Sequence, residues 1–455
     1  MVRPGNEAGR FTSDSKGDRR PGAVPDSLGQ ALREARRNSG LPFRALARQA
    51  GYSESHLRSV ENGHRAVTDD IAAAYDRVLA TGGEFASALA QPDSAGTPVA
   101  WDQSGTLMVL AGLTSGGGVD RRTFITASGA AMAALAARWR SALASSGPLL
   151  PGTGSRQVGQ ELVSHIGQRL DYLRHLDDEL GSGDLAVLAR TELALIVLLL
   201  RGGSYTDAVG RHLYALAAEA SRQAAWDYFD QDDHPAARWY FEAALRASAT
   251  ADDPLTGAYA LSFAAVQCYS TGQPQEAVAL LETASGAVAM TGTPKMTAML
   301  AARSARAHSK AGSKRDCARQ LHQSRAALDR GPQPDDAPVL YWVTHGEIEM
   351  IAGSSALDLG DPAQAIRCFD AAIADGYRGD DQYPRSHAIY LARAAEAHLR
   401  LHDLDAALDR AAHAVRCLGG VDSARSASAI TGLRAKLAPH AASPAVREFL
   451  DATRQ

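Results

Sequence analysis

The feature that most limits how this chain can fold is a short pattern recurring along its second half. A small residue is followed four positions later by a larger one, and three positions after that by another small one. Each copy follows a turn sequence such as Gly360-Asp361-Pro362. Small residues at this helical spacing let two helices approach closely, so the pattern predicts stacked helical hairpins. The clear copies are Ala237-Phe241-Ala244, Ala277-Leu281-Ala284, Cys317-Leu321-Ser324 and Ala365-Phe369-Ala372. A first, poorer copy is Ala208-His212-Ala215, and a weaker last copy, with Ala in the middle, is Ala407-Ala411-Ala414.

The composition agrees with a helical chain. Aromatic residues make up only 6% of the 455 residues, and Ala and Leu dominate the apolar set, which favours helices over sheets. From about residue 155 onward, helix and turn alternate without a strand signal. Residues 185–440 are similar to the tetratricopeptide repeat, and that resemblance implies an α-solenoid. The copies lie 29–48 residues apart, which is mostly longer than the roughly 34 residues of that repeat and indicates elongated helices.

The segment from Leu28 to Leu79 has the signals of a compact helical domain. Pro42 stands at the first turn of a second helix, where its missing N–H costs nothing. Gly51 ends that helix, Ser53 caps a third, and Thr68 caps a fourth. Two short helices separated by a glycine turn and flanked by further helices are typical of the helix-turn-helix.

This segment resembles the Xre and phage-repressor family of DNA-binding domains. The resemblance is carried by Ala45-Leu46-Ala47, by the Gly51 turn and by Val60-Glu61-Asn62-Gly63. It implies that the third helix enters the major groove of double-stranded operator DNA. By position, the base readers would be Glu54, Ser55, Arg58 and Ser59, with Ser53 as the cap. The phosphate contacts would be Asn62, His64 and Arg65.

Two further positions follow from the resemblance. It implies a structural pair between Arg36 and Glu61. It also exposes a departure, because Phe43 stands where the family usually has a phosphate-binding Gln, so Arg44 or backbone N–H groups must replace that contact. Between residues 28 and 65 there are seven Arg and three Glu, whereas the whole chain carries a net charge of -4. This local basic segment supports DNA binding here and not in the repeats.

The repeat region has its own candidate site. In a solenoid of this kind, the first helix of each hairpin lines the concave face. Aromatic rings beside Arg suit an extended peptide, since the rings cover apolar side chains and Arg fixes a carbonyl or carboxylate. For any single residue, packing against a neighbouring hairpin is the stronger expectation, but for the groove as a whole we predict a peptide or protein ligand. The register places Arg222, Trp226, Tyr259, Tyr269, Arg306 and Glu347 in this groove.

The chain is therefore predicted to be all-α, with an N-terminal lambda-repressor-like helix-turn-helix domain and a C-terminal tetratricopeptide-repeat α-solenoid. The absence of any apolar run of about 18 residues predicts no membrane association, and the polar start lacks the apolar core of a signal peptide. We expect a cytoplasmic, nucleoid-associated protein. The predicted parts are a disordered tail at 1–25, the DNA-binding domain at 26–90, a linker with short helices at 91–154 and the repeats at 155–455.

Enzyme chemistry has little support in the sequence. The glycines at 116–118 lack the Lys of a phosphate-binding loop, and no nucleophile-elbow motif is present. His398 and His402 are spaced four apart, but Leu-Arg-Leu separates them instead of the metalloprotease pattern. The four Cys form no C-x-x-C pair and are interpreted as core residues. We expect no enzyme activity, no catalytic residue, no metal and no cofactor.

The layout as a whole is similar to actinobacterial Xre-type regulators and to the peptide-sensing regulators of Gram-positive bacteria. That resemblance implies a transcription regulator of development or secondary metabolism. A homodimer would read a two-fold operator, because one helix-turn-helix covers too small a site for selectivity. The repeats would dimerise and sense a peptide or protein. The alternative is a scaffold whose repeats dock a partner while the DNA-binding domain only localises it.

Overall fold

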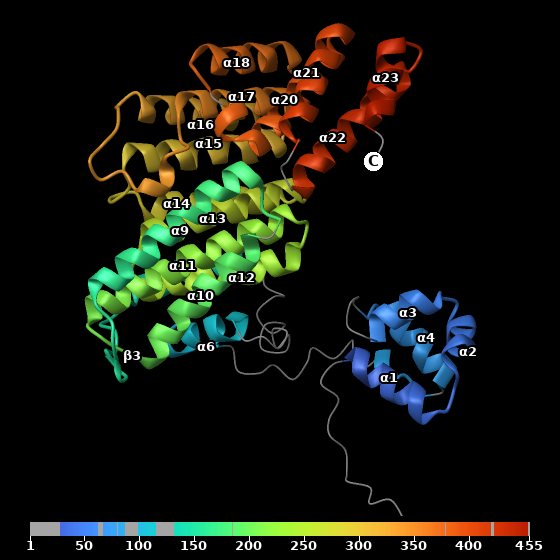
Figure 1. Cartoon of the computed structure of the whole chain (residues 1–455), viewed down its shortest axis with the longest axis vertical. Coiled ribbons are helices and arrows are strands. Elements are labelled where there is room, and N and C mark those ends of the chain that lie inside the picture. The colour runs from blue at the N-terminus through green and yellow to red at the C-terminus, as the bar shows by residue number, and fades with distance from the viewer. Residues whose placement is uncertain are drawn as a thin grey trace, which may run out of the picture. The chain divides into compact units, whose positions relative to one another are not determined.

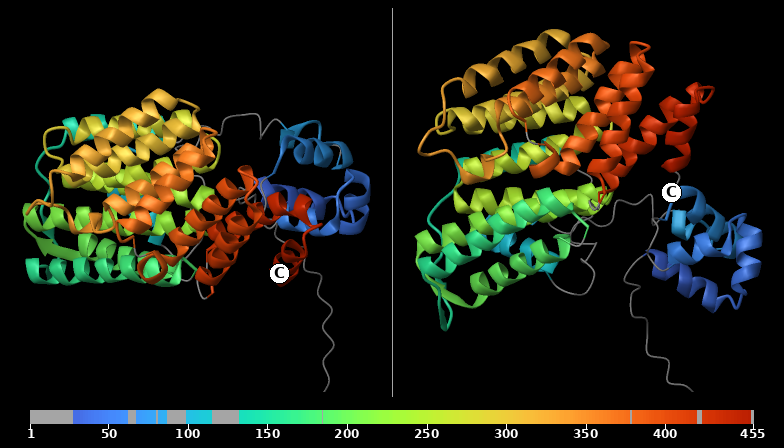
Figure 2. Two further views of the ribbon diagram at one scale, coloured as in Figure 1. Left: turned by 90° about the horizontal axis from the view of Figure 1, so that it is seen from above. Right: turned by 45° about the horizontal axis from the view of Figure 1, so that its top comes forward.

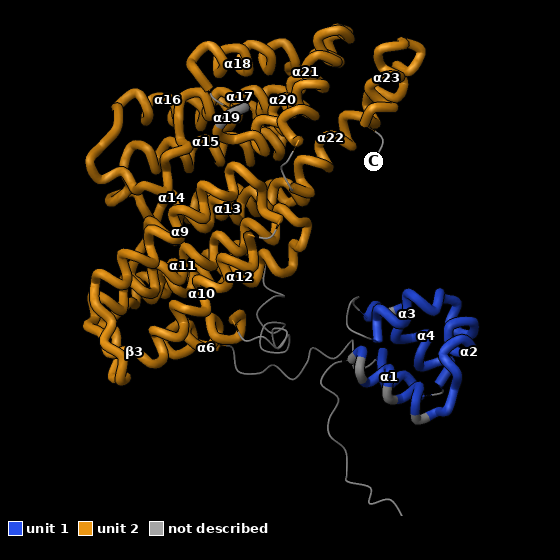
Figure 3. Tube along the Cα trace, viewed as in Figure 1, with its two compact units in different colours: residues 1–97 blue, residues 98–455 orange. Residues whose placement is uncertain are grey.

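The computed structural model describes residues 28–61, 67–79, 81–86, 99–114, 132–183, 185–377, 379–419 and 423–453. Nearly all of the regular structure in these residues is helical, which confirms the predicted all-α class. The chain divides into two compact units, residues 1–97 and residues 98–455 (Figure 3). None of the described helices is both long and apolar enough to span a bilayer.

Unit 1 is a small helical domain with its own core. Gly51 ends α2 in the left-handed conformation with φ 80°, and its N–H donates to the carbonyl oxygen of Ala47. Ser53 caps α3, because its Oγ accepts from the backbone N of His56 at 3.2 Å. The turn between α2 and α3 is thus fixed from both sides. The helices are α1 (Leu28–Asn38), α2 (Phe43–Ala50), α3 (Glu54–Glu61) and α4 (Asp69–Leu79) (Figure 1). The fully buried core side chains are Leu32, Leu46, Leu57, Val60, Ala72 and Tyr75.

Unit 2 is a stack of helix pairs (Figures 1 and 2). Each pair packs side by side across a short turn, and successive pairs pack on one another. A small sheet near its start joins β1 (Gly152–Thr153) antiparallel to β3 (Gly203–Tyr205), which also pairs parallel with β2 (Arg156–Gln157). The early helices are α6 (Gln103–Thr114), α8 (Met132–Ala144), α9 (Gln160–Leu180), α10 (Leu185–Gly202), α11 (Asp207–Asp230), α12 (His234–Ala251) and α13 (Pro254–Ser270). The middle helices are α14 (Pro274–Ala287), α15 (Pro294–Lys310), α16 (Lys314–Leu328), η1 (Pro338–Leu340), α17 (His345–Asp358) and α18 (Pro362–Ala374). The last are α19 (Gly379–Gln382), α20 (Pro384–Arg400), α21 (Leu404–Cys417), α22 (Ala424–Leu437), η2 (Ala438–His440) and α23 (Pro444–Ala452).

The recurring small-large-small residues lie where the paired helices meet. Ala365, Phe369 and Ala372 of α18 are all buried, and the Phe369 ring fills the space left by Gly353 of α17. A Cβ at position 353 would lie 2.6 Å from that ring. The earliest copy of the pattern behaves differently, because Ala208 is exposed and α11 buries the next residue, Val209, instead.

Two helices from the segment described by sequence as a linker pack into the core of unit 2. Trp139 of α8 is fully buried, and its Nε1 donates to the hydroxyl of Ser248 at 2.9 Å. The buried guanidinium of Arg246 donates to the carbonyl oxygens of Val99 and Ala100, the latter at 2.9 Å. Apolar side chains of these short helices thus complete the α12 and α13 surface, which explains why residues 99–114 and 132–144 belong to unit 2.

Candidate functional site

The described base-reading candidates lie on or beside α3 of unit 1. Ser55 and Arg58 are exposed, and Glu54 and Ser59 are half-buried on the same helix. Ser53 is exposed at the helix start. Arg44 projects from α2 and is exposed as well. The predicted phosphate contacts Asn62, His64 and Arg65 lie outside the described residues.

Arg58 is held at the surface by a ring and a carboxylate. Its guanidinium carbon lies 4.5 Å from the ring centre of Phe43, and Arg36 stacks on that ring at the same distance. One guanidinium nitrogen of Arg58 lies 3.7 Å from a carboxylate oxygen of Glu54. An exposed ion pair of this length stabilises little, so Arg58 can exchange it for a base or a phosphate. Phe43 therefore orients Arg58, although it cannot make the phosphate contact expected of a Gln.

A buried polar triad fixes α3 against α1 and α4. Arg36 donates two hydrogen bonds to the carboxylate of Glu61, both at 2.8 Å, and the hydroxyl of Tyr75 donates to the same carboxylate at 2.9 Å. The hydrogen bond with Glu61 raises the pKa of Arg36. Burial, followed by the charge of Glu61, raises the pKa of Tyr75. Arg36 therefore keeps its charge and Tyr75 its proton at neutral pH, and together they satisfy the buried carboxylate.

In unit 2 the structure brings the six predicted groove residues around one cavity of about 210 Å³. They come from the first helix of successive pairs, with Arg222 on α11, Tyr259 on α13, Arg306 on α15 and Glu347 on α17. The wall also includes residues of α9, α20 and α22, which sequence reasoning did not place there. The six are Arg222, Trp226, Tyr259, Tyr269, Arg306 and Glu347.

The cavity wall is rich in arginine. Seven arginines and three carboxylates line it, beside five tyrosines and two tryptophans. Carboxylates just behind the wall, such as Glu219 and Asp358, pair with several of these arginines, and the rings supply apolar area. The arginines are Arg174, Arg222, Arg303, Arg306, Arg385, Arg393 and Arg425, and the carboxylates are Asp177, Asp178 and Glu347.

Most of these arginines are ion-paired within the wall. Glu219 accepts from Arg174 at 2.7 Å and from Arg222 at 2.9 Å. Arg385 of α20 donates two hydrogen bonds to Asp177 of α9, at 2.6 and 2.8 Å. These pairs tie together helices that are far apart in the sequence.

Arg306 is committed in the same way. Its guanidinium pairs with Asp358 of α17, which also accepts from Arg393 at 2.5 Å. Burial acts to raise the pKa of Asp358, but the charges of Arg306 and Arg393 lower it below its usual range. Arg306 therefore lines the cavity as part of the wall.

Arg303, one helical turn before Arg306, is placed differently. Its guanidinium carbon lies 5.5 Å from the ring centre of Phe263 and 5.0 Å from that of Trp342. It donates to the hydroxyl of Tyr269 at 3.5 Å, and its Nε finds no hydrogen-bond partner in the part of the chain that the structure describes. No ion pair of Arg303 within 4.0 Å is found among the described residues; burial acts to lower its pKa, and Tyr269, Tyr390 and the carboxylate of Glu347 together raise it. Sequence reasoning selected Arg306 and missed Arg303, although a spacing of three puts both on one helix face.

Two cavity carboxyls titrate near neutrality. Burial raises the pKa of Glu347 to about 7, and the hydroxyl of Tyr390 donates to its carboxylate at 2.6 Å. Burial also raises the pKa of Asp178 to about 7, and the Tyr341 hydroxyl donates to it. Both carboxyls therefore hold a proton more readily than an exposed carboxyl does.

The comparison with known proteins concerns unit 1. A family model described as a helix-turn-helix domain matches residues 27–89, a range that contains α1 to α4. No curated protein matches the chain. With its capped α2–turn–α3 geometry, unit 1 is a helix-turn-helix domain of the DNA-binding kind.

Proposed function

We propose that this chain is a sequence-specific transcription regulator with two separate tasks for its two units. Unit 1 reads an operator through α3, and unit 2, a tetratricopeptide-like solenoid, dimerises and senses a peptide. The observation that carries the first task is the outward presentation of Ser55 and Arg58 on a helix held by the buried Arg36–Glu61 pair. Residues aimed at solvent from a rigid helix are what groove recognition needs.

Footprinting of the purified chain on its own promoter region tests this function directly. At about 150 mM salt, non-specific binding is weak, so protection reports a specific site. We expect a protected segment with two-fold symmetry. If no segment of the promoter region or of a genomic fragment library is protected, operator recognition is wrong and the scaffold alternative takes its place.

Alanine variants of Arg58 and Arg44 distinguish a base contact from a phosphate contact. Arg58→Ala should weaken operator binding by about 1–3 kcal/mol and random DNA much less, because a base contact contributes only at the right sequence. Arg44→Ala should weaken both DNAs equally. Arg77→Ala, which removes an exposed charge of α4, is the matched control. Equal losses on both DNAs for Arg58→Ala would reduce it to a phosphate contact.

For unit 2, the cavity supports a peptide carrying a free carboxylate. Arg303 offers a guanidinium flanked by two rings and without an ion pair among the described residues, which suits a carboxylate beside apolar groups. A cavity of about 210 Å³ is below the roughly 300–1,000 Å³ of drug-sized sites. It suits the end of a short peptide better than a folded protein. A ligand can act only by favouring one arrangement of the dimer over another.

A library of short peptides with free carboxyl termini, compared with the same library amidated, tests this ligand class. We expect peptides with a free carboxyl terminus to be enriched. When such a peptide binds, the footprint on the operator should be either lost or gained. Arg303→Gln should lower peptide affinity about 10- to 100-fold, the size of one lost charge-assisted pair. Arg319→Gln on the outer helix α16 is the control, since its side chain is 58% exposed.

The biological role and the alternative belong to the same proposal. From the family resemblance we infer control of development or secondary metabolism in an actinobacterium. The scaffold alternative predicts a protein partner that binds residues 98–455 and leaves operator affinity unchanged. A pull-down on unit 2 followed by footprinting in the presence of the captured partner distinguishes the two.

A further inference from the structure

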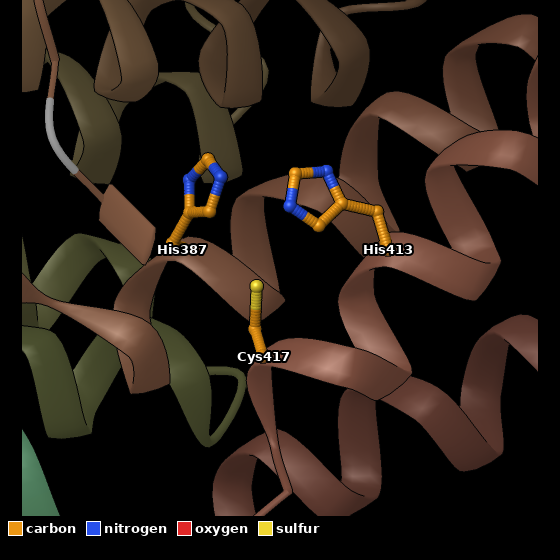
Figure 4. A group of neighbouring side chains, drawn as sticks. All are labelled: His387, His413 and Cys417. Carbon is orange, nitrogen blue, oxygen red and sulfur yellow. The ribbon is translucent and has the colours of Figure 1, made fainter. Parts of the chain in front are cut away.

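Three metal-ligating side chains meet at one end of the hairpin formed by α20 and α21 (Figure 4). His387 lies in the first turn of α20, and His413 and Cys417 lie in the last two turns of α21. One ligand atom from each side chain lies within 4.8 Å of the other two. Among the described residues this is the one group of three His, Cys, Asp or Glu side chains that converges in this way.

The backbone places these residues for chelation. His413 and Cys417 are four residues apart on one helix, so their side chains share a face of α21. His387 faces them from the partner helix, with its ring centre 5.5 Å from that of His413 and the two planes at 79°. The ligand atoms of a tetrahedral zinc site lie about 3.3–3.7 Å apart, as its bond lengths require. Side-chain rotations that move the ligand atoms by about 1 Å would bring the three atoms to that spacing.

The location suits a cation. Cys417 is the last residue of α21, where the unpaired carbonyls give the helix end a partial negative charge. Cys417 also differs from the other three cysteines, which are buried, because it is only partly buried. Core packing therefore accounts for Cys268, Cys317 and Cys368 more fully than for Cys417.

We propose that His387, His413 and Cys417 bind a zinc ion that clamps the open end of the α20–α21 hairpin. Two imidazoles and a thiolate are the donor set that zinc prefers, with a fourth position for water or a further ligand. The short turn at residues 401–403 closes the other end of this hairpin. The sequence predicts no metal site, because His413 and Cys417 lie 26 and 30 residues after His387 and the three residues form no metal-binding motif.

The proposed zinc site is connected to the ligand cavity through α20. Arg385, two residues before His387, is the side chain that joins α20 to Asp177 of α9. Fixing the first turn of α20 fixes the backbone from which that guanidinium extends. The metal would thus hold the carboxy-terminal wall of the cavity in place and is a structural ion.

Cobalt titration of the untagged, metal-stripped full chain tests the site. We expect one Co²⁺ per chain, with the visible bands of tetrahedral cobalt and a thiolate-to-cobalt charge-transfer band, both abolished by adding zinc. Cys417→Ser should lose the charge-transfer band, and His413→Ala should weaken cobalt binding at least about 10-fold. Cys368→Ser on α18 and His398→Ala at the opposite end of α20 are matched controls and should titrate as the wild type does.

A stability measurement supplies a second readout. Zinc should raise the melting temperature of the wild type and leave that of Cys417→Ser unchanged, since only a native-state site is stabilised by mass action. The proposal is overturned if the wild type binds no stoichiometric cobalt, or if His413→Ala and Cys417→Ser both bind as tightly as the wild type. Equal losses in the two controls would overturn it too, because binding would then not belong to this cluster.

Discussion

At the scale of single residues, Glu61 shows how one buried carboxylate can organise a domain. It accepts from Arg36 on α1 and from Tyr75 on α4 while lying at the end of α3. The Arg36–Glu61 pair could be anticipated from a family resemblance. The Tyr75 hydroxyl could not, because nothing in the local sequence says that its ring turns inward toward α3.

Glu61→Ala should lower the free energy of unfolding of unit 1 by about 1–3 kcal/mol, because it leaves the buried hydroxyl of Tyr75 and the partly buried guanidinium of Arg36 without an acceptor. Glu61→Gln keeps one acceptor oxygen and should cost less. Hydrogen exchange of the unit 1 amides in the full chain measures the loss. Glu54→Ala on the same helix is the control, expected within about 0.5 kcal/mol of the wild type, because the 3.7 Å ion pair that its half-buried carboxylate forms with Arg58 stabilises little. Similar protection in Glu61→Ala and Glu54→Ala would contradict the triad's role.

Glu347 predicts a pH dependence of unit 2. Burial raises the pKa of Glu347 to about 7, above the 4.5 of an ordinary Glu side chain, so between these pH values the native chain binds more protons than the unfolded chain. The free energy of unfolding should therefore fall as the pH rises through this window. Glu347→Gln should reduce this decline in the free energy of unfolding by about 1–2 kcal/mol. The Gln side-chain oxygen can still accept the hydrogen bond from the Tyr390 hydroxyl. Urea unfolding at pH 5, 6 and 7.5 measures it, and identical slopes for both proteins would refute the assignment.

At the scale of elements, the small-large-small pattern predicts correctly where helix pairs occur. It predicts less accurately at which residue the buried face of each helix begins. Ala365, Phe369 and Ala372 pack as the pattern predicts, whereas in α11 the buried face begins at Val209. A long helix that contacts several neighbours has several apolar stripes, so a single stripe does not fix its register. The placement of α8 could not be predicted either, because Trp139 packs on residues more than 100 positions away.

The close approach of α17 and α18 gives a test at this scale. Gly353→Ala should destabilise unit 2 by about 1–3 kcal/mol, because the new methyl group would overlap the Phe369 ring. Phe369→Leu in the same chain should recover part of that loss. Gly432→Ala on α22 is the matched control, since nothing lies within 4 Å of the new methyl group and Ala favours the helix by about 1 kcal/mol. Thermal unfolding of the three variants measures the difference, and a neutral Gly353→Ala would disprove the tight fit.

At the scale of the whole molecule, the proposed dimer needs a self-complementary apolar surface on unit 2. Several large apolar side chains of α9 and α10 are exposed, among them Tyr172 of α9 and Val187, Leu188 and Leu198 of α10. Leu198→Glu should dissociate the dimer in sedimentation experiments, and Met290→Glu should not. Met290 is 95% exposed and stands apart between α14 and α15, which makes it the control. A dimer that persists in Leu198→Glu would place the contact elsewhere.

Because Arg246 anchors Val99 and Ala100 to unit 2, the stretch of chain between this anchor and the DNA-binding unit has a maximum length. Thirteen residue steps separate Ala86 from Val99, and even fully extended these span no more than about 47 Å. For the proposed dimer, this upper bound limits how far apart two half-sites can lie, and docking of one DNA-binding unit raises the effective concentration of the other at its half-site.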